Sequence, residues 1–98
     1  MEKRTLLTII AEASIENAII QDIKRLGAMG YTLVEASGEG SRGVRSSDWD
    51  QGRNVRIEVI CEEQVARRIV DHLTQTYYKN YAMAMYLTAV DVIRPDKF

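Results

Sequence analysis

The 98-residue chain has few of the residues that would mark several common protein classes. Its single cysteine, Cys61, cannot form an internal disulfide, and a single histidine leaves no Cys/His cluster for zinc. No apolar run approaches the roughly 20 residues of a membrane-spanning helix. The run from Leu6 to Ala11 is too short for a signal peptide, and Glu12 follows it at once. We therefore expect a cytoplasmic protein.

The chain also lacks a strong charge of either sign. Thirteen lysines and arginines oppose 14 aspartates and glutamates, which gives a formal net charge of −1. A domain that coats nucleic acid is usually strongly basic, so nucleic acid is excluded as the main partner. The hydrophobic fraction of 46% is that of an ordinary soluble protein, and the length suffices for one small core. A single domain over residues 1–98 is expected.

The hydrophobic pattern predicts the order strand, helix, strand, strand, helix, strand. The expected strands cover residues 5–11, 31–37, 54–61 and 82–93. The first helix is expected to start after Ser14 as its N-cap and the second at Glu62, while Pro95 ends the last strand. This βαββαβ order is typical of the ferredoxin-like fold. We therefore expect an α+β domain with a four-stranded antiparallel sheet and two helices on one face.

The first and last strands are apolar on both faces. Leu6 and Ile10 alternate with Leu7 and Ile9, and the last strand has methionines on one parity and Tyr86 on the other. A sheet with both helices on one side leaves its second face bare, and a chain of this length has nothing left to cover it. Another copy of the chain is therefore expected on that face.

Residues 38–54 read GEGSRGVRSSDWDQGRN, with four glycines, three serines, three arginines and one tryptophan. We expect this segment to be a flexible loop, because it has little apolar surface to bury. Arg42 and Arg45 lie three residues apart and suit a phosphate, while Ser41 and Ser46 offer further donors. The alternative is that both arginines are solvated and pair with acidic residues of the same loop.

Two aromatic residues in polar surroundings have no evident packing partner in the sequence. Trp49 either folds onto the stem of the loop or anchors a partner protein, since tryptophan is over-represented at interface hot spots. His72 lies in the second predicted helix without a nucleophile or another ligand near it in sequence. We expect His72 at the surface.

Three stretches carry a resemblance to a known family. GYTLVEASGEGSRG, residues 30–43, resembles the segment that leads into the T-loop of the PII signalling superfamily, with its glycine, threonine, strand glutamate and G-x-G. NVRIEVI resembles the strand that follows this loop, and VDVIRP resembles the final strand with its basic residue. The GSRGVRS spelling and the ending DKF are most similar to the PII-like carbon-sensing proteins of the SbtB type.

The resemblance implies a homotrimeric regulator that is not an enzyme and requires no metal. It would bind an adenyl nucleotide (AMP, cAMP, ADP or ATP) in clefts between subunits, and its T-loop at about residues 38–54 would regulate a membrane bicarbonate transporter in inorganic-carbon acclimation. The protein would then be cytoplasmic and attached to the membrane only through the transporter. The residues implied in nucleotide binding are Thr32, Ser41, Arg42, Arg45, Ser46, Glu58, Ile60 and Arg94.

The sequence departs from the family pattern at one loop. The glycine-rich B-loop of ATP-specific members is absent, and Tyr78-Lys79-Asn80-Tyr81 stands in its place. This difference favours ligands with fewer phosphates, AMP and cyclic AMP included. The tyrosine that is uridylylated in some members also has no counterpart.

Two other functions share the predicted topology. An acylphosphatase-like enzyme or a slow nucleotide hydrolase would need a phosphate-cradling loop after the first strand, where AEASIEN has no arginine or glycine, and no nucleophile with its base is evident. An RNA-binding domain would need aromatic residues on the two central strands. TLLTIIA and VRIEVI have none, which disfavours RNA binding.

Overall fold

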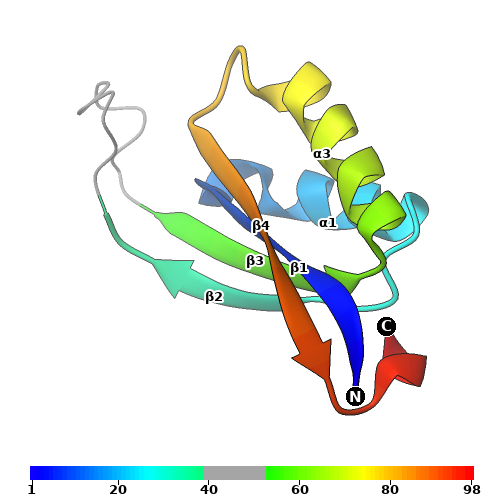
Figure 1. Ribbon diagram of the computed structural model, residues 1–98. Coiled ribbons are helices and arrows are strands. Elements are labelled where there is room, and N and C mark those ends of the chain that lie inside the picture. Colours follow the sequence, from blue (N-terminus) through cyan, green and yellow to red (C-terminus); the bar gives the residue numbers. More distant parts are fainter. Residues whose placement is uncertain (39–52) are drawn as a thin grey trace.

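The structure is a computed structural model that describes residues 1–38 and 53–98 (Figure 1). The predicted order of elements is confirmed. The first strand is longer than expected, because Glu2, Lys3 and Arg4 also pair with the last strand. The elements in chain order are β1 (Glu2–Glu12), the 3-10 turn η1 (Ala13–Ile15), α1 (Glu16–Arg25), β2 (Thr32–Ala36), β3 (Asn54–Cys61), α3 (Glu63–Tyr77), β4 (Met83–Val92) and the 3-10 turn η2 (Pro95–Lys97).

The four strands form one antiparallel sheet in the order β2-β3-β1-β4. β1 is central: it pairs with β3 from Thr5 to Glu12 and with β4 from Glu2 to Ala11. α1 and α3 both cover the same face of the sheet (Figure 1). The fold is therefore the ferredoxin-like α+β arrangement predicted from the sequence.

The core lies between the sheet and the helices. Leu7 and Ile9 of β1 are fully buried there, beside Val55, Ile57 and Val59 of β3. β3 has one buried face, since its alternate residues are half-buried or exposed apart from Asn54. The helices contribute their apolar stripes to the same core: Ile15, Ile19, Ile20, Ile23, Ala66, Ile69 and Leu73.

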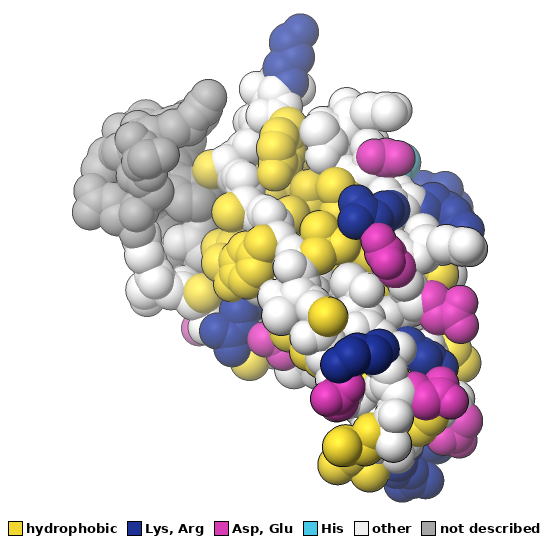
Figure 2. All heavy atoms as spheres, viewed as in Figure 1, with side chains coloured by type: hydrophobic (Ala, Val, Ile, Leu, Met, Phe, Trp, Pro, Cys, Tyr) yellow, Lys and Arg dark blue, Asp and Glu magenta, His cyan; other side chains and the backbone are white. Residues whose placement is uncertain are grey.

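The face of the sheet away from the helices is also apolar. Leu6, Ile10 and Ile60 are half-buried on it, while Val34 is 37% and Tyr86 50% exposed. The prediction that β1 and β4 are apolar on both sides is therefore confirmed. Figure 2 shows apolar side chains gathered in the middle of the molecule, with charged side chains distributed around them.

The start of the first helix differs from the prediction. Ser14 is not the N-cap: it lies in η1, and α1 begins at Glu16 after Ile15 without a capping side chain. Two contacts hold this tight turn. The Ala13 N–H donates to the Arg53 carbonyl at 2.9 Å, and Ile15 is buried in the core. Tertiary contacts therefore override the local capping preference of serine.

A glycine sets the end of α1. Gly27 has a φ of 119°, which an L-residue rarely adopts. Its N–H donates to the Lys24 carbonyl at 3.2 Å, and the Ala28 N–H donates to the Ile23 carbonyl at 2.9 Å. These two bonds form a Schellman motif, which ends the helix.

Candidate functional site

Three of the predicted nucleotide-binding residues lie together on the open face of the sheet. The register between β2 and β3 makes Thr32 and Glu58 direct partners, so their side chains stand side by side. Ile60 follows Glu58 by two residues and therefore shares its face. Thr32 is exposed, and the other two are half-buried. The structure therefore places these three residues on one face of the sheet.

The Glu58 carboxylate, which stands beside Thr32 on the open face, retains hydrogen-bonding capacity. Its charged neighbour on the same face is Arg56, whose Nε lies 3.5 Å from Oε2, and both side chains are more than one-third exposed. Exposed pairs of this kind contribute little to stability. Glu58 can therefore accept a hydrogen bond from a ligand without losing a structural contact of consequence.

Thr32 and its partner Glu58 lie next to an open edge of the sheet. β2 is an edge strand, so within the described part of the chain the N–H and C=O groups on its outer side have no partner strand. From Thr32 the edge runs to Ala36, about 13 Å further on at the usual strand rise, and then enters the glycine-rich segment at Gly38. This edge offers backbone donors and acceptors over about the length of a nucleotide.

The remaining predicted loop residues lie outside the part of the chain that the structure describes: Ser41, Arg42, Arg45, Ser46 and Trp49. The two ends of their segment are described. Ala36 and Asn54 are direct partners in the sheet, and Asn54 also pairs with Glu12. Both ends of the segment therefore leave the same end of the sheet, next to the end of β1.

Asn54, which lies at the base of the 38–54 segment, was not identified from the sequence as a candidate site residue. It is 7% exposed, and its buried Oδ1 has no hydrogen-bond partner among residues 1–38 and 53–98. A buried polar atom without a partner is uncommon. The sequence signal that could have drawn attention to it is the polar residue placed at the start of an otherwise apolar strand.

The turn that replaces the B-loop lies at the same end of the sheet. The Ala82 N–H donates to Glu12 Oε2 at 2.8 Å, which ties the start of β4 to the end of β1. Since Glu12 is paired with Asn54, residues 78–81 and the base of the 38–54 segment adjoin the same strand end.

Arg94 does not join Thr32 and Glu58 within one chain. It is exposed and precedes η2, beyond the point where Val92 pairs with Glu2. Thr32 pairs with Glu58, and Glu58 pairs with Thr8, which lies six residues further along β1 than Glu2, or about 20 Å at the usual strand rise. A site that uses both Arg94 and Thr32 would have to draw them from different subunits.

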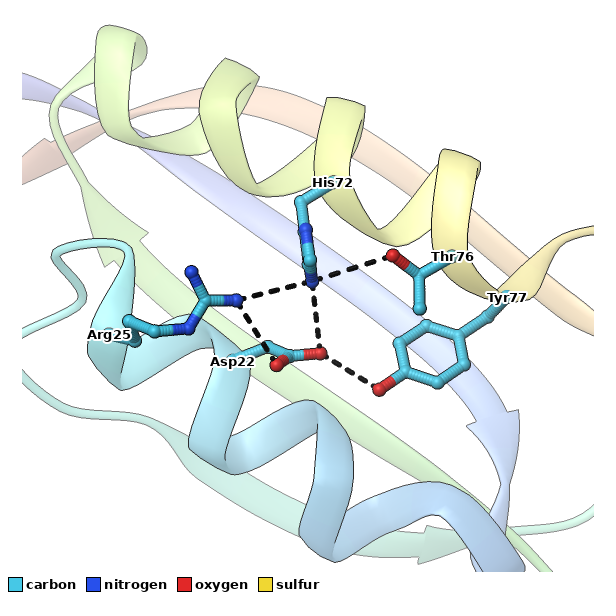
Figure 3. Close-up of polar contacts among 5 residues, drawn as sticks. All are labelled: Asp22, Arg25, His72, Thr76 and Tyr77. Atoms are coloured by element: carbon cyan, nitrogen blue, oxygen red, sulfur yellow. Dashed lines mark hydrogen bonds and ion pairs between the residues drawn. The ribbon is translucent and has the colours of Figure 1, made fainter.

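A polar cluster between the two helices corrects the expectation for His72. His72 is only half-buried rather than on the free surface, and its Nε2 lies 3.3 Å from Asp22 Oδ2 (Figure 3). Arg25 Nη2 lies 3.3 Å from both Asp22 Oδ1 and His72 Nε2. Thr76 contacts the same imidazole nitrogen at 3.5 Å. The sequence could not show this cluster, because it depends on how α1 packs against α3.

Tyr77 completes the cluster. Its hydroxyl donates to Asp22 Oδ2 at 2.8 Å, and its ring packs edge-to-face on Tyr81 with centroids 6.0 Å apart. Burial, followed by the hydrogen bond to the Asp22 carboxylate, raises the pKa of Tyr77 to about 12. Tyr77 is the last residue of α3, so this bond fixes the point where the 78–81 turn begins.

The described residues offer little support for catalysis or metal binding. Burial, and secondarily the charge of Glu62, raises the pKa of Cys61, so its thiol is held in the less nucleophilic form. No group of three or more potential metal ligands occurs in residues 1–38 and 53–98. In the same residues, no helix is long and apolar enough to cross a membrane.

The comparison with known families assigns the chain to one of the families that share this topology. The profile described as nitrogen regulatory protein P-II matches residues 4–97. The chain belongs to the P-II family. This assignment confirms the resemblance to the PII superfamily.

Solved structures of P-II-like proteins have the same fold. A PII-like signaling protein from Thermus thermophilus is 46% identical, with a TM-score of 0.83 over 98% of this chain and 95% of that one. CPII from Thiomonas intermedia, solved with ADP and bicarbonate, is 23% identical with a TM-score of 0.84 over 99% and 95%. The same CPII, solved with ADP, AMP and acetate, gives 21% identity and a TM-score of 0.80 over 98% and 94%.

Proposed function

We propose that this P-II family member is a signalling protein of the SbtB type that binds an adenyl nucleotide along β2. The pairing of Thr32 with Glu58, with Ile60 on the same face, carries this proposal. The adenine would lie over Ile60, with Thr32 and Glu58 as polar partners. CPII, which shares the fold, was solved with ADP and AMP, and this supports an adenyl ligand.

The phosphate would lie where β2 enters the glycine-rich segment. A ligand that starts at Thr32 and follows the edge reaches Gly38, beyond which Ser41, Arg42, Arg45 and Ser46 follow in sequence. Arginine forks and closely approaching backbone N–H groups suit phosphate oxygens. The 78–81 turn has no glycine, which favours AMP, cAMP or ADP over a clamped triphosphate.

The site would be completed by a neighbouring subunit in a homotrimer. Arg94 lies too far from Thr32 to serve the same ligand within one chain, as the strand register indicates. The open face of the sheet offers an apolar surface for such an assembly, with Tyr86 and Val34 at its margins. An Arg94 from one subunit would then reach the phosphate bound along β2 of the next.

Nucleotide binding would set the state of the 38–54 segment, which would act as the T-loop toward a membrane bicarbonate transporter. Ordering a loop through phosphate contacts is an established switching mode. Trp49 is the residue of this segment best suited to anchor a protein partner. The protein would act in the cytoplasm as a regulator without catalysis of its own, and would reach the membrane through the transporter.

Calorimetry of the purified protein tests the nucleotide site. We expect AMP, cAMP or ADP to bind, and Arg45→Ala to lower that affinity by at least tenfold while adenosine binding stays unchanged. The expectation follows from a charge-assisted hydrogen bond worth roughly 1.5–3 kcal/mol. Arg67→Ala is the matched control, because Arg67 is an exposed residue of α3 that pairs with Glu63 at 2.8 Å. Equal losses for adenosine and AMP would show that Arg45 does not bind the phosphate.

A reconstituted transporter tests the partner. Wild-type protein should cosediment with vesicles that contain a bicarbonate transporter, and the amount bound should change when the preferred nucleotide is added. Trp49→Ala should bind nucleotide normally but cosediment poorly. Cosedimentation that is equal with and without the transporter would refute this role.

A further inference from the structure

One end of the sheet carries both chain termini. Among the described charged residues at this end, Arg4 has the most buried side chain. Only 17% of its side chain is exposed. Its Nη1 donates to the Lys3 carbonyl at 2.9 Å and lies 3.3 Å from Glu2 Oε1. Its Nη2 donates to the Pro95 carbonyl at 3.4 Å, a contact that spans 91 residues of sequence. Arg4 therefore connects the first strand to the C-terminal turn.

Burying the Arg4 guanidinium costs more free energy than leaving a charged group at the surface. The Arg4 Nε is buried and has no hydrogen-bond partner among residues 1–38 and 53–98. A mostly buried guanidinium with an unpaired donor costs free energy, whereas the neighbouring Lys3 keeps its ammonium in water, with 74% of its side chain exposed. The fold thus tolerates a cost at Arg4 that an exposed charge would avoid.

The turn that Arg4 holds is the one that carries Arg94. The Pro95 carbonyl accepts both the Arg4 bond and a bond from the Phe98 N–H at 3.1 Å, while the Lys97 N–H donates to the Arg94 carbonyl at 3.1 Å. The backbone of Arg94 is thereby fixed at the start of η2, and its side chain is exposed. Arg4 sets the point from which Arg94 projects.

We propose that Arg4 is a positioning residue for phosphate recognition: it docks η2 on β1 so that Arg94 reaches the phosphate of the bound nucleotide. This proposal rests on the proposed function, in which Arg94 contacts that phosphate across a subunit boundary. Arg4 itself touches no ligand. Because a docked turn limits the positions open to the Arg94 side chain, less conformational entropy is lost when the phosphate binds.

The test measures the affinities of AMP and adenosine in wild-type protein and in Arg4→Lys, Arg94→Ala and the double variant. Lysine keeps the charge but loses the planar fork, so it cannot make the same set of bonds. We expect Arg94→Ala to weaken AMP at least tenfold and Arg4→Lys about three- to tenfold, with adenosine unchanged in both. The double variant should bind AMP no worse than Arg94→Ala, because both substitutions remove one shared effect.

Lys3→Ala is the matched control, since Lys3 is adjacent and its ion pair with Asp91 is exposed. It should bind AMP like the wild type. If Arg4→Lys does not fold, Arg4→Met takes its place, because it has similar length and no charge to bury.

The outcomes separate the two proposals. If the wild type binds no adenyl nucleotide, the proposed function fails and Arg4 loses its role with it. If the wild type binds AMP and Arg94→Ala weakens it, but Arg4→Lys binds AMP like the wild type, only the Arg4 proposal fails. Equal losses for AMP and adenosine in Arg4→Lys, or additive losses in the double variant, would also overturn it, because they indicate a general structural effect.

Discussion

The hydrogen bond from Tyr77 to Asp22 gives the fold a stability that depends on pH in a defined direction. We predict that Tyr77→Phe lowers the free energy of unfolding by about 1.5 kcal/mol at neutral pH. A hydrogen bond to a charged group contributes roughly 1.5–3 kcal/mol, and the lower end applies here. Asp22 keeps its contacts with His72 and Arg25, both at 3.3 Å, so the substitution leaves no unpaired carboxylate.

The pH dependence follows from the raised pKa. Tyr77 has a pKa of about 12 in the folded protein, against an ordinary value of 10, so the fold favours the protonated hydroxyl. A raised pKa contributes stability that is fully present below pH 10 and is lost as the pH rises from 10 to 12. The difference between the wild type and Tyr77→Phe should therefore shrink over this range.

Urea denaturation at one fixed protein concentration measures these differences, since assembly makes apparent stability depend on concentration. Tyr78→Phe is the matched control, because Tyr78 is 44% exposed and should be nearly neutral. A double-mutant cycle with Asp22→Asn should show coupling between the two positions. Equal stability of Tyr77→Phe and wild type at neutral pH, or a difference that widens above pH 10, would refute the reasoning.

Three further predictions concern the helix end, the open face and the loop. Gly27→Ala should lower the free energy of unfolding by about 1–2 kcal/mol, because Gly27 has a positive φ. Gly30→Ala is the control: its added Cβ meets nothing within 4 Å, so it should change the free energy of unfolding by less than about 0.5 kcal/mol. Thermal and urea unfolding of the two variants measure the difference. Tyr86→Glu should dissociate the trimer while keeping the circular dichroism spectrum, as light scattering would show, and a trimer that persists would place the interface elsewhere. Trp49→Ala should melt within a few degrees of the wild type, and ready unfolding would instead make Trp49 a packing residue.

The fold could be predicted because the sheet periodicity is strong and local. Leu7 and Ile9 against Leu6 and Ile10, together with the alternation of β3, predict both faces of the sheet without any knowledge of long-range contacts. The prediction that Ser14 caps the first helix was wrong, because it relied on a local preference that tertiary packing overrides. The capping preference of Ser14 is a weak local signal, and the burial of Ile15 outweighs it.

The candidate site was predictable only in part. Thr32, Glu58 and Ile60 follow from the family resemblance, and strand pairing places them on one face. The cluster of Asp22, His72 and Tyr77 could not be predicted, because it depends on the placement of one helix against the other. The role of Arg4 likewise depends on a contact between residues at opposite ends of the chain.

The central place of β1 has a consequence for how the protein forms. β1 is the first element of the chain, and its ladder with β4 joins Glu2–Ala11 to Met83–Val92. During synthesis, β1 can pair with β3 on one side, but its other edge stays unpaired until residues 83–92 have been made. Pairing over so long a separation is slow, since loop closure must precede the contacts. The nascent protein therefore exposes an apolar strand edge until β4 has left the ribosome, and the sheet can be completed only then.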